Sequence, residues 1–340
     1  MKKILVIGTG GTIASRQSSS GLVPILTAEE LVSHVPDVAN IAELDAIQVC
    51  NLDSTDIVPS DWLRIADAIR EHYEEYDGFV VCHGTDTLAY TAAGLSYLIQ
   101  NSARPIVITG SQKPIDAEDT DARRNLRDSI CYAADEASSD VSIVFDGKVI
   151  AGTRAKKQKS KSFDAFSSVN FPNIAIIVDG RIIRYIQKPV LPGDAGRGLL
   201  FTGRGPLFAQ DVSNKVFVLK LVPGMSPDIL PVLFDRYDCL IIESFGVGGI
   251  PAYLMPEFRK QMEQHSTIVI VSTQVSNEGS NMSVYQVGHD VKEDYDLLET
   301  YDMTGESAFA KACWILGLPG ITGEMFKRYF YTPIDYDLTY

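Results

Sequence analysis

A threonine hydroxyl follows a glycine-rich turn near the start of the chain. Residues 4–7 form a short apolar run, typical of a buried strand, and 8–12 then read Gly-Thr-Gly-Gly-Thr. Glycines allow a sharp turn and a close approach of the backbone to a ligand. Two interpretations follow: a nucleotide loop or plain tight turn, or a nucleophilic Thr12 with backbone N–H groups around it to hold an oxyanion.

The nucleotide interpretation requires features that the next residues lack. Ile13 occupies the third glycine position of the GxGxxG pattern, and no acidic residue ends a strand about 20 residues later. Residues 15–21 are small and polar, which predicts a loop where a dinucleotide fold would begin a helix. Such a loop is either a plain surface loop or a lid that excludes water from a reactive hydroxyl.

A second run of chemically useful residues, HGTDT, occupies 83–87 and directly follows the apolar segment 78–82. Thr85 and Asp86 in this run have an ordinary interpretation as helix N-cap residues. In the functional interpretation, Asp86 binds a substrate ammonium or orients a lysine. Paired with Thr12, these residues supply a nucleophile, a second hydroxyl and a carboxylate, which suits acyl transfer.

A basic island lies within an otherwise acidic chain, at residues 154–161 (RAKKQKSK). It is either a solvated basic loop or the source of a lysine that acts as a base because neighbouring cations disfavour its charged form. The sequence alone leaves both interpretations open.

The elements that must position these residues alternate between strand and helix. Strands are expected at 4–7, 46–50, 78–82, 105–109 and 141–145, and helices at 27–35, 60–76, 88–99 and 121–137, the first opened by a capping box at Thr27 and the second capped by Ser60. Continuous apolar strands separated by helices predict βαβ units on a parallel sheet. Polar loops at 8–15, 51–56, 83–87 and 110–114 then share the carboxyl edge, where such sheets bind ligands.

A second α/β unit is expected after residue 213. A β-hairpin at 174–185 precedes an aperiodic stretch rich in glycine and proline. We therefore predict two open α/β domains with mostly parallel sheets: a larger N-terminal domain over 1–190, a linker over 191–213 and a smaller C-terminal domain over 214–340. In the C-terminal domain, strands are expected at 216–220, 239–243 and 267–272, and helices at 227–237, 253–265, 305–316 and 323–329.

Composition excludes several classes of protein. The 340 residues carry a net charge of −14, which argues against a nucleic-acid partner. Five dispersed cysteines indicate a reducing compartment. No signal peptide and no apolar stretch of membrane-spanning length is seen, so a cytoplasmic protein without a membrane partner is expected. The five histidines show no metal-ligand spacing, and neither a metal nor another cofactor is expected.

TGGTIAS at 9–15 and HGTDT at 83–87 together resemble the two active-site signatures of the bacterial L-asparaginase family. Their order and spacing extend the resemblance over nearly the whole chain. The direct N-terminal start and the TGSQ loop at 109–112 are similar to the cytoplasmic type I branch. The resemblance implies hydrolysis of L-asparagine to L-aspartate and ammonia, without a cofactor, in a homodimer or homotetramer.

The resemblance also implies residue roles. Thr12 matches the nucleophile, which forms an aspartyl ester, and Thr85 matches the second essential threonine. Asp86 and Lys157 match its carboxylate and lysine partners, with Lys156 as a one-residue alternative. The substrate-binding residues implied are Gly11, Asp53, Ser54, Thr55, Thr85 and Asp86, with backbone N–H groups near Gly11 and Thr85 forming the oxyanion hole.

The chain departs from the family pattern at two places. Many relatives carry a lid tyrosine in a Gly-Tyr-x-Pro arrangement, where 21–24 has Leu22 instead, so that position offers no hydroxyl as proton acceptor. Type I relatives also bind asparagine at a regulatory site, which would match 244–246 and 273–275. Val275 replaces a cysteine found there in some relatives.

Three alternatives remain open on the sequence alone. One is a glutaminase-type amidohydrolase, which pocket volume would decide. Another is an amidotransferase subunit built on the same catalytic domain, which normally carries an extra N-terminal domain. The third, from a different class, is a non-catalytic amino-acid sensor, against which the intact set of Thr12, Thr85, Asp86 and Lys157 argues.

Overall fold

The computed structural model describes residues 1–18, 21–187, 205–284, 292 and 294–339. The chain divides into two compact units, Met1–Gln210 and Asp211–Tyr340. The predicted linker over 191–213 falls partly outside the described residues. Within it, β14 (Leu207–Phe208) pairs with β6 (Ile99–Gln100) of the first unit.

The first unit is built on a mostly parallel sheet, in the order β13-β12-β9-β8-β7-β5-β1-β4. Strands β4, β1, β5, β7 and β8 run parallel, whereas β9, β12 and β13 add on antiparallel. The bounds of the parallel strands are Lys2–Gly10 (β1), Ala42–Leu52 (β4), Gly78–Cys82 (β5), Pro105–Thr109 (β7) and Asp140–Phe145 (β8), and those of the antiparallel strands are Lys148–Ala151 (β9), Ala175–Val178 (β12) and Arg181–Arg184 (β13).

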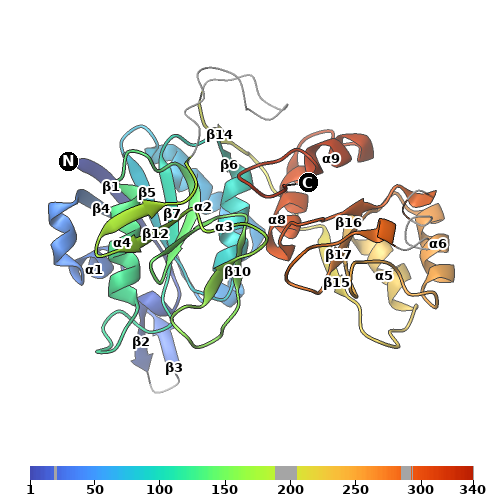
Figure 1. Cartoon of the computed structure of the whole chain (residues 1–340), viewed down its shortest axis with the longest axis horizontal. Coiled ribbons are helices and arrows are strands. Elements are labelled where there is room, and N and C mark those ends of the chain that lie inside the picture. Colours follow the sequence, from blue (N-terminus) through green and yellow to red (C-terminus); the bar gives the residue numbers. More distant parts are fainter. Residues whose placement is uncertain (19–20, 188–204, 285–291, 293, 340) are drawn as a thin grey trace. The chain divides into compact units, whose positions relative to one another are not determined.

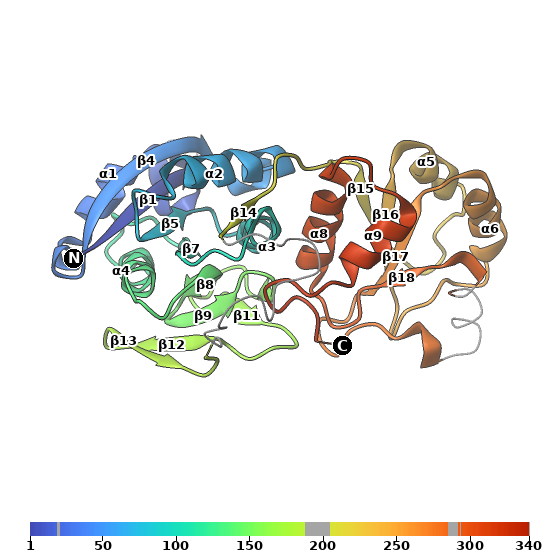
Figure 2. The ribbon, with the colours of Figure 1, turned by 90° about the horizontal axis from the view of Figure 1, so that it is seen from above.

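Helices cover both faces of this sheet. In Figure 2, α2 and α3 lie on one side of the parallel strands, and α1 and α4 on the other. Their bounds are Ala28–Ser33 (α1), Pro59–His72 (α2), Leu88–Leu98 (α3) and Ala122–Ala133 (α4). All five residues of β5 and of β7 are buried, which explains their continuous apolar sequences. Helices α2 and α3 pack closely, because a Cβ on Gly94 would lie 2.6 Å from the Trp62 ring.

The second unit contains a parallel sheet in the order β15-β16-β17-β18 (Figure 1). Its core is formed by apolar side chains of the strands and of helices α5 and α6. The element bounds are Val216–Lys220 (β15), Ile229–Arg236 (α5), Cys239–Ser244 (β16), Met255–Gln264 (α6), Ile268–Thr273 (β17), Leu298–Glu299 (β18), Gly305–Gly317 (α8) and Gly323–Phe330 (α9). The predicted α/β class with two mostly parallel sheets is confirmed.

Two local predictions are wrong, and a third segment, whose interpretation the sequence left open, contains strands. The loop expected over 15–21 contributes to a hairpin of β2 (Ser15–Ser18) and β3 (Gly21–Pro24), which is held by backbone pairing that side-chain pattern does not reveal. The basic island at 154–161, for which a solvated loop was one of two open interpretations, begins with β10 (Ala155–Lys157), which pairs with β11 (Phe166–Ser168) in a ribbon that follows β9. Helix α2 has Val58 rather than Ser60 as its N-cap, because Pro59 starts the helix and the Asp61 carboxylate accepts the Val58 N–H.

Helix α4 carries a buried carboxylate, that of Asp128. Its side chain is 5% exposed and lies 3.6 Å from Arg124 Nε. Burial outweighs the attraction of the neighbouring arginines and raises its pKa to about 6. Because the folded state binds this proton more tightly than the unfolded chain, the group's contribution to stability is fully present below about pH 4 and is lost as pH rises through 6.

We therefore expect Asp128→Asn to be more stable than the parent at pH 8, by on the order of 2 kcal/mol. The advantage should shrink as pH falls from 7 to 4. Thermal unfolding of both proteins across this range measures the difference. A constant difference at all pH values would show that the substitution acts through packing rather than charge.

Candidate active site

Three loops meet at the carboxyl edge of the first sheet. Strand β1 lies between β4 and β5, so the residues that follow these three strands are neighbours in space. A Cβ on Gly11 would lie 2.2 Å from Gly84 Cα, and one on Gly84 would lie 2.6 Å from Ser54 Oγ. The three polar runs that were predicted to share one edge are therefore in direct contact. The backbones of Gly11 and Gly84 are so close that no side-chain atom fits between them.

Glycine is required at residue 11 for two separate reasons. Its φ of +75° lies in the left-handed region, which L side chains rarely adopt. The backbone of Gly84 also leaves no room for a side chain on residue 11. The turn ends in the 3₁₀ segment η1 (Thr12–Ala14), which is held by the Ala14 N–H and the Ser15 hydroxyl, both donating to Gly11 O. The first residue of η1 is Thr12, and its hydroxyl makes no hydrogen bond to any residue that the structure describes.

Lys157 joins two residues of the HGTDT run. Its Nζ lies 2.8 Å from Thr85 Oγ1 and 2.7 Å from Asp86 Oδ1. The Lys157 side chain is 17% exposed and that of Asp86 is 59% exposed, so the ammonium is largely sheltered while the carboxylate faces solvent. These bonds come from Lys157 at the end of β10, not from its neighbour Lys156.

The loop after β4 supports the same cluster. Asp53 caps the 3₁₀ segment η3 (Ser54–Asp56), where its Oδ1 accepts from both the N–H and the hydroxyl of Thr55 at 2.9 Å. Ser54 is buried, and its Oγ accepts the Asp86 N–H at 3.3 Å. Asp53 and Thr55 remain exposed at the mouth of this edge, where a ligand can reach them.

His83 is a structural member of the HGTDT run. It is fully buried, and burial lowers its pKa to about 4, so the imidazole is neutral. Its Nδ1 lies 2.7 Å from Gly84 O, an acceptor only, so Nδ1 carries the proton. Nε2 must then accept the Thr91 hydroxyl, 3.0 Å away. The ring thus fixes the turn that presents Thr85.

Sequence reasoning missed two residues of the site, Gln112 and Asp121. Thr85 Oγ1 donates to Gln112 Oε1 at 3.2 Å, in the fourth polar loop. The backbone N–H groups of Gln112 and Lys113 donate to the carboxylate of Asp121, whose pKa burial raises. The TGSQ spacing marked this loop as a ligand edge, but nothing in it indicated that the glutamine side chain reaches Thr85.

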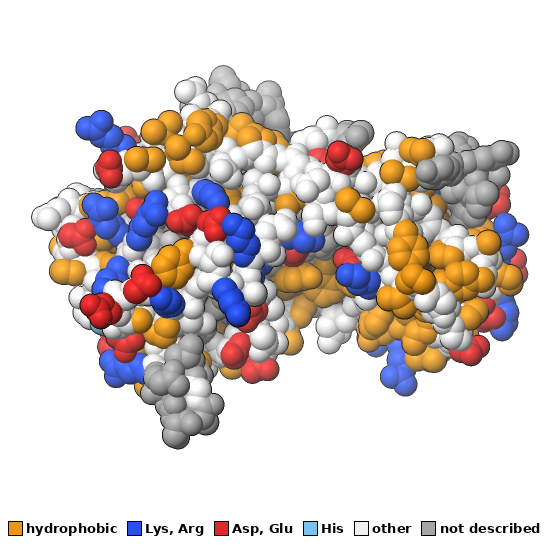
Figure 3. Space-filling view, turned by 60° about the horizontal axis from the view of Figure 1, so that its bottom comes forward, with side chains coloured by type: hydrophobic (Ala, Val, Ile, Leu, Met, Phe, Trp, Pro, Cys, Tyr) orange, Lys and Arg blue, Asp and Glu red, His pale blue; other side chains and the backbone are white. Residues whose placement is uncertain are grey.

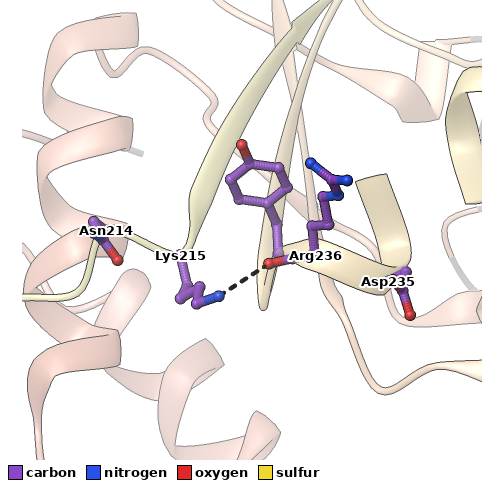
Figure 4. A pocket seen from close by; sticks show the side chains of 5 residues that line it. Asn214, Lys215, Asp235 and Arg236 are labelled. Atoms are coloured by element: carbon purple, nitrogen blue, oxygen red, sulfur yellow. Dashed lines mark hydrogen bonds between the residues drawn. The ribbon is translucent and has the colours of Figure 1, made fainter. Parts of the chain in front are cut away.

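The second unit has two hollows near the amino ends of its strands, where the strands begin. One is lined by Asn214, Lys215, Asp235, Arg236 and Tyr237, and within it Lys215 Nζ donates to Arg236 O at 3.5 Å (Figure 4). A larger one, lined by His265 and Thr267 among others, also opens where the strands begin. Parallel sheets bind ligands where strands end, so neither hollow is a candidate for the chemistry.

Metal-ligand clusters and membrane-spanning helices are both missing from the described parts of the chain. Within those parts, no group of three or more His, Cys, Asp or Glu side chains is arranged to hold a metal ion. The helices found there include none with the length and apolarity needed to cross a bilayer.

Comparisons with known proteins agree with this geometry. Residues 3–191 match the N-terminal domain of asparaginase, and residues 215–330 match the glutaminase/asparaginase C-terminal domain. The chain belongs to the asparaginase family. The L-asparaginase of Thermococcus kodakarensis is 36% identical over 93% of each chain, and L-asparaginase 1 of Escherichia coli is 33% identical over 93% of this chain and 92% of that one.

Solved structures of this asparaginase family share the fold of both units. The thermostable L-asparaginase from Thermococcus kodakarensis matches with a TM-score of 0.87 and 32% identity over 99% of each chain. The L-asparaginase I from Vibrio cholerae matches with a TM-score of 0.85 and 27% identity over 100% of this chain and 99% of that one.

A second group of relatives has another name. A glutamyl-tRNA(Gln) amidotransferase chain of Pyrococcus abyssi is 31% identical over 93% of this chain and 72% of its own length. The chain is therefore similar both to proteins named as asparaginases and to proteins named as amidotransferase subunits.

The close contact at Gly11 can be tested against a matched glycine. Gly180, in the β12–β13 turn, has a φ of +73°, but the nearest atom to the position of a Cβ there is Arg127 Nη2, at 3.7 Å. We expect Gly180→Ala to cost about 1 kcal/mol from backbone strain alone. Gly11→Ala should cost about 1–3 kcal/mol more, because it also overlaps Gly84. Thermal unfolding midpoints compare the two, and equal losses would contradict the contact.

Proposed function

We propose that this enzyme is an L-asparagine amidohydrolase that acts through a threonyl acyl-enzyme. The observation that carries the proposal is the placement of Lys157 Nζ 2.8 Å from Thr85 Oγ1, on a loop whose backbone touches the turn that bears Thr12. A nucleophile, a second hydroxyl and a base are what hydrolysis of a linear amide requires.

The residue roles follow from charge and position. The Thr12 hydroxyl attacks the side-chain amide carbonyl, and backbone N–H groups near Gly11 and Thr85 hold the oxyanion. The Thr85–Lys157 pair takes up the hydroxyl proton and returns one to the leaving ammonia. Water then enters by the same route and hydrolyses the aspartyl ester, which releases aspartate and regenerates the threonine.

Substrate binding is assigned to the carboxylates and hydroxyls around this pair. Asp86, exposed and adjacent to Lys157, is suited to the α-ammonium of asparagine. Asp53, Ser54 and Thr55 lie on the loop that contacts the Asp86 backbone, and we assign them to the α-amino and α-carboxylate groups. No metal or other cofactor has a role in this scheme.

We also propose an oligomeric state, a cellular location and a regulatory site for this protein. Large apolar side chains are exposed on the second unit, among them Val222, Phe245, Tyr253 and Val275. Figure 3 shows hydrophobic side chains gathered on the surface of this unit. Exposed apolar patches of this sort mark interaction surfaces, which supports a homodimer or homotetramer. A cytoplasmic location and a regulatory asparagine site near 244–246 and 273–275 rest on the family resemblance.

A second candidate is a glutaminase-type amidohydrolase, favoured by the amidotransferase relatives. Steady-state kinetics with L-asparagine and L-glutamine separate the two, since the proposal requires the higher kcat/KM for asparagine. A non-catalytic amino-acid sensor, the remaining alternative, would bind an amide without releasing ammonia.

Replacing the nucleophile tests the reaction directly. Thr12→Ala should lower ammonia release from L-asparagine by about 10³-fold or more, because no other group can form the acyl-enzyme. Thr12→Ser keeps a hydroxyl and should retain measurable turnover. Ammonia release at the parent rate by Thr12→Ala would end the proposal, whereas binding without turnover in the parent protein would favour the sensor.

Two adjacent lysines allow a matched test of the base. Lys157→Met removes both contacts of the ammonium, to Thr85 and to Asp86, and we expect kcat to fall by about 10²-fold or more. Lys156→Met removes the same charge one residue away and should change kcat by less than about 5-fold. Steady-state kinetics on L-asparagine measure both. A larger effect from Lys156 would reassign the base.

A further inference from the structure

Gln112 occupies a bridging position beside the catalytic pair. Its Oε1 lies 3.2 Å from Thr85 Oγ1, on the one side. On the other side, its Nε2 lies 3.1 Å from Ser162 O and 3.5 Å from Lys159 O. The side chain therefore connects the loop after β7 both to the HGTDT turn and to the segment that follows Lys157.

The chemistry of these partners fixes the orientation of the amide. Backbone carbonyls only accept hydrogen bonds, so the NH₂ end of Gln112 must face Ser162 O and Lys159 O. The carbonyl oxygen of the amide then faces Thr85. Since that oxygen only accepts, the Thr85 hydroxyl must donate its single proton to Gln112.

This orientation has a consequence for Lys157. A hydroxyl whose proton is committed to Gln112 Oε1 offers only its lone pairs to Lys157 Nζ, 2.8 Å away. Lys157 must therefore donate to Thr85, as an ammonium does readily. A neutral amine can also donate to Thr85, but it is better stabilised when a donor reaches its lone pair, and Thr85 can become that donor only by breaking its bond to Gln112. Asp86 Oδ1 also faces Lys157 Nζ, at 2.7 Å, and this carboxylate is unchanged in every variant compared below.

Gln112 is held so that it cannot easily turn away. Its backbone N–H and that of Lys113 both donate to the Asp121 carboxylate, at 2.9 Å and 3.1 Å. Asp121 in turn accepts from Asn125 Nδ2 at 3.3 Å. The loop is thus tied to the start of α4 by a buried carboxylate, and the glutamine side chain projects from a fixed backbone.

We propose that Gln112 is a positioning residue that sets the direction of proton transfer between Thr85 and Lys157. It holds the Thr85 proton away from Lys157 in the resting site, so that Thr85 offers the lysine a hydrogen-bond acceptor and not a donor. This inference rests on the proposed amide hydrolysis, in which Thr85 and Lys157 take up the nucleophile's proton.

Two substitutions at this residue should act in opposite directions. Gln112→Met removes the acceptor at similar volume, so Thr85 becomes free to donate to neutral Lys157, and the acid limb of kcat/KM should shift to lower pH. Gln112→Glu keeps an acceptor and adds a negative charge near Lys157, so the limb should shift to higher pH. Each shift is expected to be about half a pH unit or more.

A control separates this effect from loosening of the loops. The side chain of Lys113 lies over the Phe163 ring, 5.3 Å from Nζ to the centroid, and so joins the same two segments. Phe163→Leu weakens this packing without altering charge or the Thr85 contact. It should leave the pH of half-maximal kcat/KM unchanged, even if it lowers the thermal midpoint.

The experiment uses two readouts on the parent protein and the three variants. The first is the pH profile of kcat/KM for L-asparagine. The second is the pH dependence of acetylation of Lys157 by acetic anhydride, resolved from neighbouring lysines by fragment mass spectrometry. Only the neutral amine reacts, so this second readout needs no turnover.

The outcomes are distinguishable. Opposite shifts for the Met and Glu variants in both readouts, with none for Phe163→Leu, support the proposal. An active parent whose two Gln112 variants lose rate without shifting, or shift in the same direction, overturns it and leaves the proposed function intact. The parent protein could also prove inactive on L-asparagine while the pH dependence of Lys157 acetylation still shifts in opposite directions in the two Gln112 variants. That result overturns the proposed function but leaves intact the inferred direction of the hydrogen bonds among Gln112, Thr85 and Lys157.

Discussion

The backbone contact between Gly11 and Gly84 is the constraint on which the site depends. Two parallel neighbours, β1 and β5, end at one edge, and each is followed by a turn that must present a hydroxyl. Adjacent strands lie only about 4.8 Å apart, so the turns would collide unless both lacked side chains at the point of approach. Glycine precedes both Thr12 and Thr85, and this lets the two turns that bear them approach each other.

Much of this arrangement could be predicted from the sequence, because strong local signals agree with the fold. The buried runs at 78–82 and 105–109 have the predicted bounds, since continuous apolar residues between polar turns have no other stable placement in a covered parallel sheet. The strand at 216–220, which lies at the edge of its sheet, also has the predicted bounds. The capping box at Thr27 is present. The four polar loops followed from strand direction alone, and the loops that bear Thr12, Thr85 and Ser54 are in contact.

The remaining features depend on interactions between segments distant in sequence. Strands β10 and β11 are three residues each, and their pairing is between residues 9–13 apart that carry no alternating pattern. The hairpin pairs the polar residues of β2 with Gly21–Pro24 of β3, and neither short segment shows the alternation of apolar and polar residues that marks a strand. Gln112 reaches Thr85 only because Asp121 fixes its loop. Such contacts are set by tertiary geometry, which local propensity does not encode.

The ribbon that carries Lys157 lies outside the eight-stranded sheet of the described residues, and its ladder has three residue pairs. Elements with so few cross-strand bonds open in native-state fluctuations far more often than the core strands that end near Thr12. Lys157 and Thr12, the proposed nucleophile, therefore belong to regions of unequal local stability. On the proposed mechanism, mild denaturant or heat would abolish activity by opening the ribbon and displacing Lys157. The eight-stranded sheet, and the spectroscopic signal that comes from it, would stay intact.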